Sequence, residues 1–286
     1  MSKHVFSRTG FSLIAVVAAM VLLSCGGNKK NIVDVDELHR RDSLESAMDT
    51  LQLLEDQSEP PMTVDGLFDD FFFTFVTNQS FQMQRIRFPL PVSDSDGARM
   101  VRRDGWDEYN KFIFQEQFSV IFEDDDDLMV KNDTSVRRVS VELINLQTSK
   151  ADVYTFRKDA AVWMLSTIDE VDVEDLPNGL FLDFFVHFMN DSVFQQRSID
   201  EPLRVITSHD TEEDLMTEEK YEAADWHRLK HNYPLPKAEL VNIDYGQPSN
   251  GVRHKQLLLQ SMNDDLYMKF TFHKYRTDWK LIEIDN

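Results

Sequence analysis

The sequence predicts an α+β fold made of two tandem repeats, each with helices packed on one face of a curved antiparallel sheet. Three observations lead to this fold class. The 286-residue sequence repeats itself, each copy opens with an apolar helical stripe, and each copy continues in runs that alternate apolar and polar residues. Helices followed by an antiparallel meander are typical of α+β units. The predicted repeats span residues 66–175 and 176–286.

Residues 1–24 have the pattern of an export signal. Lys3, His4 and Arg8 form a basic start, and the mostly apolar run 11–23 follows them. That run is too short to span a bilayer. We therefore predict a signal peptide that is removed from the mature protein. An uncleaved membrane anchor is the alternative interpretation.

Cys25 follows the apolar run and is the single cysteine of the sequence, so no intrachain disulfide is possible. The order Leu22-Leu23-Ser24-Cys25 resembles the lipobox of bacterial lipoproteins, in which cleavage leaves an acylated N-terminal cysteine. The resemblance implies palmitate-type chains on Cys25 and a membrane partner in the cell envelope. Two or more such chains hold a protein firmly on a bilayer. The alternative is an ordinary signal peptide that contains a cysteine by chance.

Residues 25–65 are predicted to be the lipidated N-terminus and a partly helical tether. Apolar residues recur at steps of three and four between Ser43, a possible N-cap, and Pro60-Pro61; they are Leu44, Ala47, Met48, Leu51 and Leu54. In some Bacteroides-type lipoproteins an acidic stretch after the cysteine resembles a surface-export signal. Gly26-Gly27-Asn28-Lys29-Lys30 departs from that pattern, which favours a periplasm-facing location over exposure at the cell surface.

The net charge of the chain limits the classes of partner that it is expected to bind. The sequence has 51 Asp and Glu against 30 Lys and Arg, a formal net charge of −21 at pH 7. Such a chain repels phosphate backbones, and it has no basic stripe that would offset the repulsion. Nucleic acid is therefore not expected as a partner.

The repeat is visible in the letters. The segment 66–75, GLFDDFFFTF, is echoed 113 residues later by 179–188, GLFLDFFVHF. After a seven-residue insertion in the second copy, Trp106 corresponds to Trp226. The other pairs, in chain order, are Phe81-Gln82 with Phe194-Gln195, Pro89-Leu90 with Pro202-Leu203, Phe156-x-Lys158 with Phe272-x-Lys274, and Trp163 with Trp279. Each copy reaches the usual size of a domain and is expected to bury its own core.

The elements of each copy follow from periodicity. Phenylalanines at i, i+3, i+4 and i+7 predict one helical face in each copy, namely Phe68, Phe71, Phe72 and Phe75, and Phe181, Phe184, Phe185 and Phe188. Asn78 and Asn190 are expected to break these helices before a short second helix, and Pro89 and Pro202 to begin an extended segment. After each tryptophan the period becomes two, which predicts strands.

This order of elements resembles the cone-shaped nuclear transport factor 2-like (NTF2-like, cystatin-like) fold. The lipobox, the tether and the doubled Phe-rich helix followed by Phe-Gln and Pro-Leu resemble an uncharacterised family of Bacteroides-type lipoproteins with a domain of unknown function. The resemblance covers nearly the whole chain. It implies the fold and the envelope location, but no activity and no catalytic residues.

Residues shared by the two copies are the first candidates for a site. Asp70 and Asp183 lie opposite the Phe stripe, where they are either general bases or surface ion pairs with Arg85 or Arg197. Two further pairs are candidates in the same sense: Gln82 with Gln195, and Trp106 with Trp226. We expect the glutamines to form hydrogen bonds with the backbone near the helix break rather than with a ligand. We expect the tryptophans to lie in the core rather than at the mouth of a pocket.

No metal or cofactor site is predicted. His227 and His231 have the i, i+4 spacing of zinc ligands, but no acidic residue of the His-Glu-x-x-His kind lies between them. The acidic run 123–127 lacks the alternating ligands of a calcium loop and is expected to be a solvated hairpin loop. The stretch 94–97 lacks the later acidic ligand. Phosphate-binding and nucleophile motifs are also missing from the sequence.

The sequence therefore favours a non-catalytic envelope lipoprotein that binds a small-molecule or protein partner. Two alternatives stay open: an enzyme with acid–base chemistry in a cone-shaped cavity, and a structural spacer. The features that the copies share are mostly those that a fold needs, whereas most polar residues suited to catalysis are not shared. This difference favours binding over catalysis.

Overall fold

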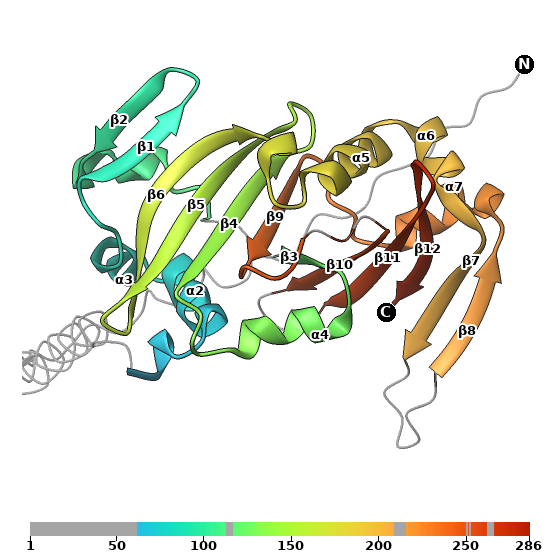
Figure 1. The fold of residues 1–286 in the computed structure, drawn as a ribbon, viewed down its shortest axis with the longest axis horizontal. Coiled ribbons are helices and arrows are strands. Elements are labelled where there is room, and N and C mark those ends of the chain that lie inside the picture. The colour runs from blue at the N-terminus through green and yellow to red at the C-terminus, as the bar shows by residue number, and fades with distance from the viewer. Residues whose placement is uncertain (1–61, 113–116, 209–215, 250, 252, 262–265) are drawn as a thin grey trace, which may run out of the picture. The chain divides into compact units, whose positions relative to one another are not determined.

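Two sets of elements follow one another along the chain in nearly the same order (Figure 1). The computed structural model describes residues 62–112, 117–208, 216–249, 251, 253–261 and 266–286, so the leader, Cys25 and nearly all of the predicted tether lie outside the described residues. The first set consists of η1 (Met62–Asp65), α2 (Phe68–Thr77), α3 (Gln79–Gln84), β1 (Leu90–Asp94), β2 (Gly97–Val101), η2 (Arg103–Glu108), β3 (Gln117–Phe122), α4 (Asp125–Leu128), η3 (Met129–Asn132), β4 (Arg138–Asn145), β5 (Lys150–Asp159) and β6 (Val162–Asp172).

The second set has nearly the same order, except that α7 and η6 precede its third strand, and its edge strands are longer. It consists of η4 (Val173–Asp175), α5 (Gly179–Asn190), α6 (Ser192–Arg197), β7 (Ile199–Ser208), β8 (Met216–Tyr221), η5 (Ala223–Asp225), α7 (Trp226–Leu229), η6 (Lys230–Asn232), β9 (Glu239–Asp244), β10 (His254–Ser261), β11 (Tyr267–Tyr275) and β12 (Asp278–Asp285). No helix among the described residues combines the length and the apolar character needed to cross a membrane.

The predicted helices form where the Phe stripes place them. All eight stripe phenylalanines are buried, four on α2 and four on α5. The Asn78 side chain accepts a hydrogen bond from the Phe81 N–H at 2.9 Å and so begins α3, as predicted. In the second set α5 continues through Asn190, and Asp191 caps α6 by accepting from the N–H groups of Val193 and Phe194. The second break therefore falls one residue later than the sequence predicted.

One twelve-stranded sheet runs through the described residues in the order β2-β1-β6-β5-β4-β9-β3-β10-β11-β12-β7-β8. Most neighbours are antiparallel, but β1 pairs with β6 and β7 pairs with β12 in parallel. The architecture is the predicted α+β class, with one large sheet in which the strands do not follow a simple meander.

The centre of this sheet contains an exchange of strands. Strand β3 pairs antiparallel with β10 of the second set, and β9 pairs antiparallel with β4 of the first set. The two exchanged strands then lie parallel to each other through Ser119 and Asn242. Each set of elements therefore completes its part of the sheet with a strand from the other set, an arrangement that periodicity alone did not predict.

Two apolar cores lie on opposite faces of the central strands. Alternate side chains of a strand point to opposite faces. Accordingly, Ile121 belongs to the core around α5, whereas its neighbours Val120 and Phe122 belong to the core around α2. Leu240 and Val241 divide in the same way. The expectation that each repeat buries its own core is therefore wrong, because each core contains side chains of the other half.

The acidic run also differs from its prediction. Residues 125–128 form the short helix α4, not a hairpin loop. The Asp124 side chain accepts hydrogen bonds from the N–H groups of Asp126 and Asp127, and the Asp127 carboxylate in turn accepts from the Asp124 N–H. Consecutive acids suit this position because carboxylates in the first turn of a helix accept from free N–H groups and complement the helix dipole.

Candidate functional site

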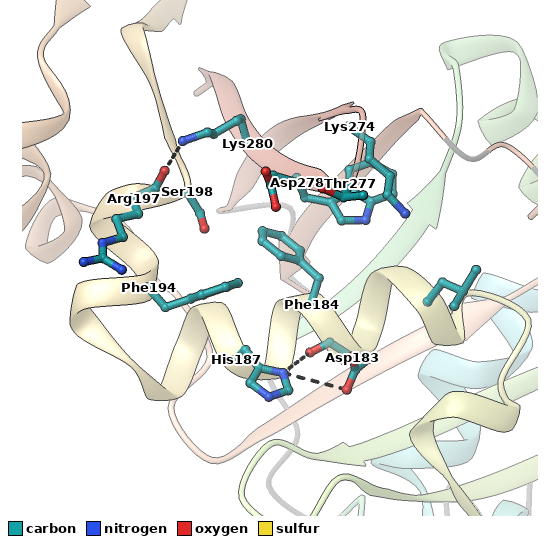
Figure 2. A pocket seen from close by; sticks show the side chains of 12 residues that line it. Asp183, Phe184, His187, Phe194, Arg197, Ser198, Lys274, Thr277, Asp278 and Lys280 are labelled. Carbon is teal, nitrogen blue, oxygen red and sulfur yellow. Dashed lines mark hydrogen bonds and ion pairs between the residues drawn. The ribbon is translucent and has the colours of Figure 1, made fainter.

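An open groove of about 690 Å³ lies where α5, α6 and the turn between β11 and β12 meet (Figure 2). We call it the α5–α6 groove. Twelve residues line it: Leu180, Asp183, Phe184, His187, Phe194, Arg197, Ser198, Lys274, Thr277, Asp278, Trp279 and Lys280. A second, smaller pocket of about 230 Å³ shares Leu180, Lys274 and Trp279 with it, so the hollow continues towards the start of α5.

Aromatic side chains form the apolar part of the α5–α6 groove. Phe184 is 8% exposed and Phe194 is 37% exposed, and their rings are 5.8 Å apart. Figure 2 shows both rings directed towards the middle of the groove, with the Ser198 hydroxyl above them. Leu180, in the first turn of α5, also lines the groove and is 78% exposed. Exposed aromatic and aliphatic side chains in a concave site are the usual apolar contacts of a ligand.

The lysine and arginine side chains that line the groove are Arg197, Lys274 and Lys280. Among the ion pairs of the described residues, none involves Arg197, Lys274 or Lys280. Lys274 Nζ lies 5.6 Å from the Trp279 ring centroid, and Lys280 Nζ donates to the Arg197 carbonyl. The Arg197 guanidinium points away from the centre of the groove in Figure 2. In a chain with a net charge of −21, Lys274 is therefore a cation held beside an apolar surface.

Asp183, one of the predicted candidates, lies at the edge of this groove. Its carboxylate is 3.7 Å from His187 Nδ1, and the same nitrogen is 2.8 Å from the Asp183 carbonyl oxygen one turn earlier. Both side chains are at least half exposed. The contact is a surface pair within one helix, with the geometry of an i, i+4 neighbour.

Asp70 does not form the ion pair with Arg85 that the sequence suggests. Asp70 is exposed on α2, and the backbone carbonyl of this residue accepts from the Thr74 hydroxyl at 3.0 Å. Arg85, its expected partner, instead pairs with Asp65 at 2.9 Å. The neighbouring Asp69 is the half-buried carboxylate, and it accepts a hydrogen bond from the Tyr245 hydroxyl of the second half. Burial raises the pKa of Asp69, although the hydrogen bond from Tyr245 opposes the shift.

Gln82 and Trp106 are brought together in the first half. The Trp106 indole Nε1–H donates to Gln82 Oε1 at 2.8 Å, and Asn110 Nδ2 donates to the same oxygen at 2.9 Å. Gln82 Nε2 donates to the Phe75 carbonyl at 3.2 Å, next to the helix break. Both predicted residues are almost fully buried, so the set fixes α3 against η2 and exposes no polar atom of the two to a ligand.

Gln195 and Trp226 do not repeat this arrangement. Gln195 Oε1 accepts from Lys230 Nζ at 3.1 Å, and the buried Trp226 Nε1 has no hydrogen-bond partner in the described part of the chain. Trp226 instead stacks on Tyr233, with the ring centroids 6.1 Å apart. The two tryptophans therefore share burial but not polar contacts.

A second concavity, of about 700 Å³, lies on the face of β4 to β6 that α2 does not cover. Glu142, which is 2% exposed, and Asp244 both line it. Asn242 Nδ2 donates to Glu142 Oε2 at 2.8 Å. Burial, reinforced by the charge of Asp244, raises the pKa of Glu142 to about 8, so this carboxyl is mainly protonated at pH 7. We call this concavity the Glu142 pocket.

The described residues do not form a metal-binding cluster. No group of three or more His, Cys, Asp or Glu side chains converges in the part of the chain that the structure describes. His227 lies on α7 with its Nδ1 2.7 Å from the Ala224 carbonyl oxygen, and His231 lies in η6.

Sequence reasoning singled out Asp183 but missed the other main residues of the groove. Lys274 and Trp279 were visible as repeated letters, yet neither was recognised as part of a site. Phe194 was read as a helix marker because its counterpart Phe81 occupies the same place in the repeat. The exposure of Phe194 depends on tertiary packing, which the repeat pattern does not report. The sequence pattern does not single out Glu142, because the aligned residue of the second copy, Leu258, is apolar and the two copies share no polar residue there.

Comparison with known proteins places the chain in a family. An NTF2-like protein from Bacteroides fragilis, of known crystal structure, is similar over 79% of this chain and 98% of its own length, with 30% sequence identity and a TM-score of 0.68. Among curated proteins none matches. The family model described as a domain of unknown function (DUF4348) matches residues 47–286. The α+β architecture is thus NTF2-like, and the chain belongs to the DUF4348 family.

Proposed function

We propose that this chain is a lipid-anchored protein of the bacterial cell envelope that binds a ligand or protein partner without catalysis. The basic and apolar leader and the lipobox-like order at Cys25 support the anchor. The lack of an acidic stretch after Cys25 supports the periplasmic side. The recurring order of elements supports an exported part built from two tandem NTF2-like units, 66–175 and 176–286.

The observation that carries the binding role is the α5–α6 groove. It joins exposed apolar side chains with Lys274, a cation that lacks an acidic partner among the described residues. The corresponding place in the first half is filled, because Phe81 is only 2% exposed there against 37% for Phe194. A groove kept open in one half only is better suited to holding a partner than to supporting the fold.

The packing of the cores supports a role without catalysis. Between α2 and the sheet, aromatic rings fill the space in which an NTF2-like cone would otherwise leave a cavity. Phe156 contacts four rings of α2, with centroid distances of 5.2 to 5.8 Å. On α5, the rings of the stripe pack against Phe272 in the same way. Acid–base chemistry needs a wet cavity with a titratable group, which such packing does not provide.

Photocross-linking in the native envelope tests the binding role. A benzophenone amino acid is placed at position 194, inside the groove, and for comparison at position 267, where Tyr267 is 55% exposed but lies outside the groove lining. We expect a defined adduct from position 194 that disappears when Lys274→Glu is added. Equal adducts from both positions, or none from position 194, would show that the groove is not the binding surface.

The anchor has its own test. Cys25→Ser is expected to release the protein from membranes and to abolish labelling by radioactive palmitate. Continued labelling of the variant would refute lipidation at Cys25. A variant that keeps the label and stays on membranes would point to another site of acylation.

The Glu142 pocket supports a second candidate, an enzyme that uses Glu142 as a general acid. A carboxyl that stays protonated near pH 7 in a concave site is suited to proton donation. Infrared spectroscopy tests this role through the carbonyl band of the protonated carboxyl, which Glu142→Gln removes. If that band does not respond when an envelope extract is added, Glu142 is a structural acid only.

A further inference from the structure

In the first half of the molecule, the chain itself fills the place that corresponds to the α5–α6 groove. Asp65, at the end of η1, accepts a hydrogen bond from the Trp163 backbone N–H at 2.9 Å through Oδ1. Its Oδ2 accepts from Arg85 Nη2 at 2.9 Å. The side chains of Arg85 and Asp65 are only 15% and 12% exposed, and the Arg85 guanidinium lies 4.6 Å from the centroid of the Phe81 ring. This ion pair covers Phe81.

A lysine completes the contacts of this segment. Lys158 Nζ donates to the Gly66 carbonyl at 2.9 Å and lies 5.4 Å from the Trp163 ring centroid. Val64, just before Asp65, packs against the first core. A short 3-10 turn with an apolar residue and a carboxylate, followed by the Gly66 carbonyl, is therefore held by a backbone N–H, two cations and aromatic rings.

The second half keeps the receiving surface. Lys274 stands opposite Trp279 in the β11–β12 hairpin, as Lys158 stands opposite Trp163 in the β5–β6 hairpin. The distance from the lysine Nζ to the indole centroid is nearly the same, 5.6 Å. Both hairpin residues line the α5–α6 groove, together with Phe194 in the place of Phe81.

The segment that would fill the groove has changed. Asn178 occupies the position aligned with Asp65, immediately before the glycine that opens each repeat. Its Oδ1 accepts from Lys255 Nζ at 3.0 Å, and the residue is buried, so it is held elsewhere. Ser198 replaces Arg85 and is too short to cover Phe194. These two replacements leave the receiving surface open.

We propose that the α5–α6 groove binds a short peptide segment of a partner protein that carries an aspartate or glutamate side chain, seated as Asp65 is seated at the end of η1 in the first half. This inference rests on the proposed binding function and names its ligand class. The peptide carboxylate accepts from the Trp279 backbone N–H, Lys274 Nζ donates to the peptide, and an apolar neighbour packs on Phe184 and Phe194. Lys274 then receives an acceptor, which it lacks among the described residues.

A short peptide with the sequence of residues 62–67 tests this directly. The peptide, blocked at both ends so that no free terminal carboxylate competes, is titrated into the full chain and followed by the NMR signals of the Trp279 backbone amide. We expect saturable binding at one site. Replacing the peptide's aspartate with asparagine is expected to weaken binding at least tenfold, because a hydrogen bond to a charged group is stronger than one to a neutral amide.

Variants of the protein supply the matched controls. Lys274→Ala is expected to weaken binding at least tenfold. Lys150→Ala, which removes the same charge at an exposed position outside the groove, is expected to leave binding unchanged. The inference is wrong if the asparagine peptide binds as well as the aspartate peptide, or if neither peptide moves the Trp279 signal. Because the first comparison changes only the peptide, it does not depend on how well a variant folds.

The cross-linking experiment separates this inference from the proposed function. If position 194 gives a groove-specific adduct that the aspartate peptide does not displace, the groove binds a partner of another chemistry, and only the peptide inference fails. If position 194 gives no adduct and the peptide does not bind, both fail. Displacement of the adduct by the aspartate peptide but not by the asparagine peptide supports both.

Discussion

At the scale of single residues, the two glutamines of the repeat have different structural value. Gln82 joins Trp106, Asn110 and the Phe75 carbonyl, whereas Gln195 receives one hydrogen bond, from Lys230. We expect Gln82→Leu to lower the free energy of unfolding by about 2–3 kcal/mol, because it leaves buried polar groups unpaired, and Gln195→Leu by about 1 kcal/mol. Urea denaturation of both variants checks this. Equal losses would contradict the assigned hydrogen bonds.

Glu142 makes stability depend on pH. Its pKa is raised from the ordinary value of 4.5 to about 8, so the folded chain binds a proton there that the unfolded chain releases between these pH values. Stability is therefore expected to fall as the pH rises from about 5 to 8. Glu142→Gln keeps an acceptor for Asn242 but does not ionise.

The difference between the two proteins isolates this residue. At pH 8 the Glu142→Gln variant is expected to be more stable than the natural protein, by an amount on the order of 3 kcal/mol, and near pH 5 the two should be similar. Thermal unfolding across this range measures the difference. A constant offset at all pH values would show that Glu142 ionises normally in the folded protein.

The sequence predicts which residues build the core, but it does not predict the contacts between segments that are distant along the chain. The Phe stripes were predicted because their period is local. The pairing of Asp65 with Arg85 and the burial of Glu142 were not, because they depend on side chains that meet only in the folded sheet. Asn178 is an example. It aligns with Asp65 and differs from it only in having an amide in place of the carboxylate, but its side chain accepts a hydrogen bond from Lys255 and is held away from the groove.

At the scale of elements, a buried lysine secures the exchanged strand β3. Lys255 on β10 has a side chain that is 3% exposed, and its Nζ donates to Glu123 at the end of β3, to Asn178 before α5 and to the Ser249 carbonyl, at 2.9 to 3.1 Å. Burial of Glu123 opposes ionisation, but the hydrogen bond from Lys255 and that from the Gly251 N–H lower its pKa overall.

We therefore expect Lys255→Met to cost about 3 kcal/mol of unfolding free energy, because it leaves the Glu123 carboxylate without its cation. Lys269→Met is the matched control on the neighbouring strand, where the pairs with Asp125 and Asp285 are longer and more exposed, and it should cost about 1 kcal/mol or less. Chemical denaturation compares the two. A small loss for Lys255→Met would mean that this contact does not hold β3 in place.

At the scale of the whole molecule, the strand exchange couples the two halves. Residues 117–122 complete the sheet of the second half, and residues 239–244 complete that of the first. Repeated sequence predicted the order of the elements correctly, but it did not determine their partners. Alternating apolar residues identify a strand and its buried face. Strands β3 and β9 bury both faces, so their sequences do not mark one face as the buried one. The two copies also contain equivalent neighbouring strands, so the sequence does not indicate which copy each strand pairs with.

Separate expression of the halves tests this coupling. We expect the fragments 62–175 and 176–286 each to unfold without cooperativity when alone. In each fragment one central strand pairs, in the whole chain, with a strand of the other fragment, so separation leaves sheet edges unpaired. Mixed together, they should form a complex that unfolds cooperatively. Cooperative unfolding of either fragment alone, as a monomer, would show that the halves are independent domains.

We propose that the protein binds its partner at one open groove in the second half, and hydrogen exchange tests that proposal most directly. Exchange of backbone amides is compared between the purified protein and the protein in its native envelope. We expect slower exchange in the envelope at residues 192–198 and 274–281, which surround the α5–α6 groove, and no change at residues 216–221 of the edge strand β8. Unchanged exchange around the groove, or protection confined to β8, would contradict it.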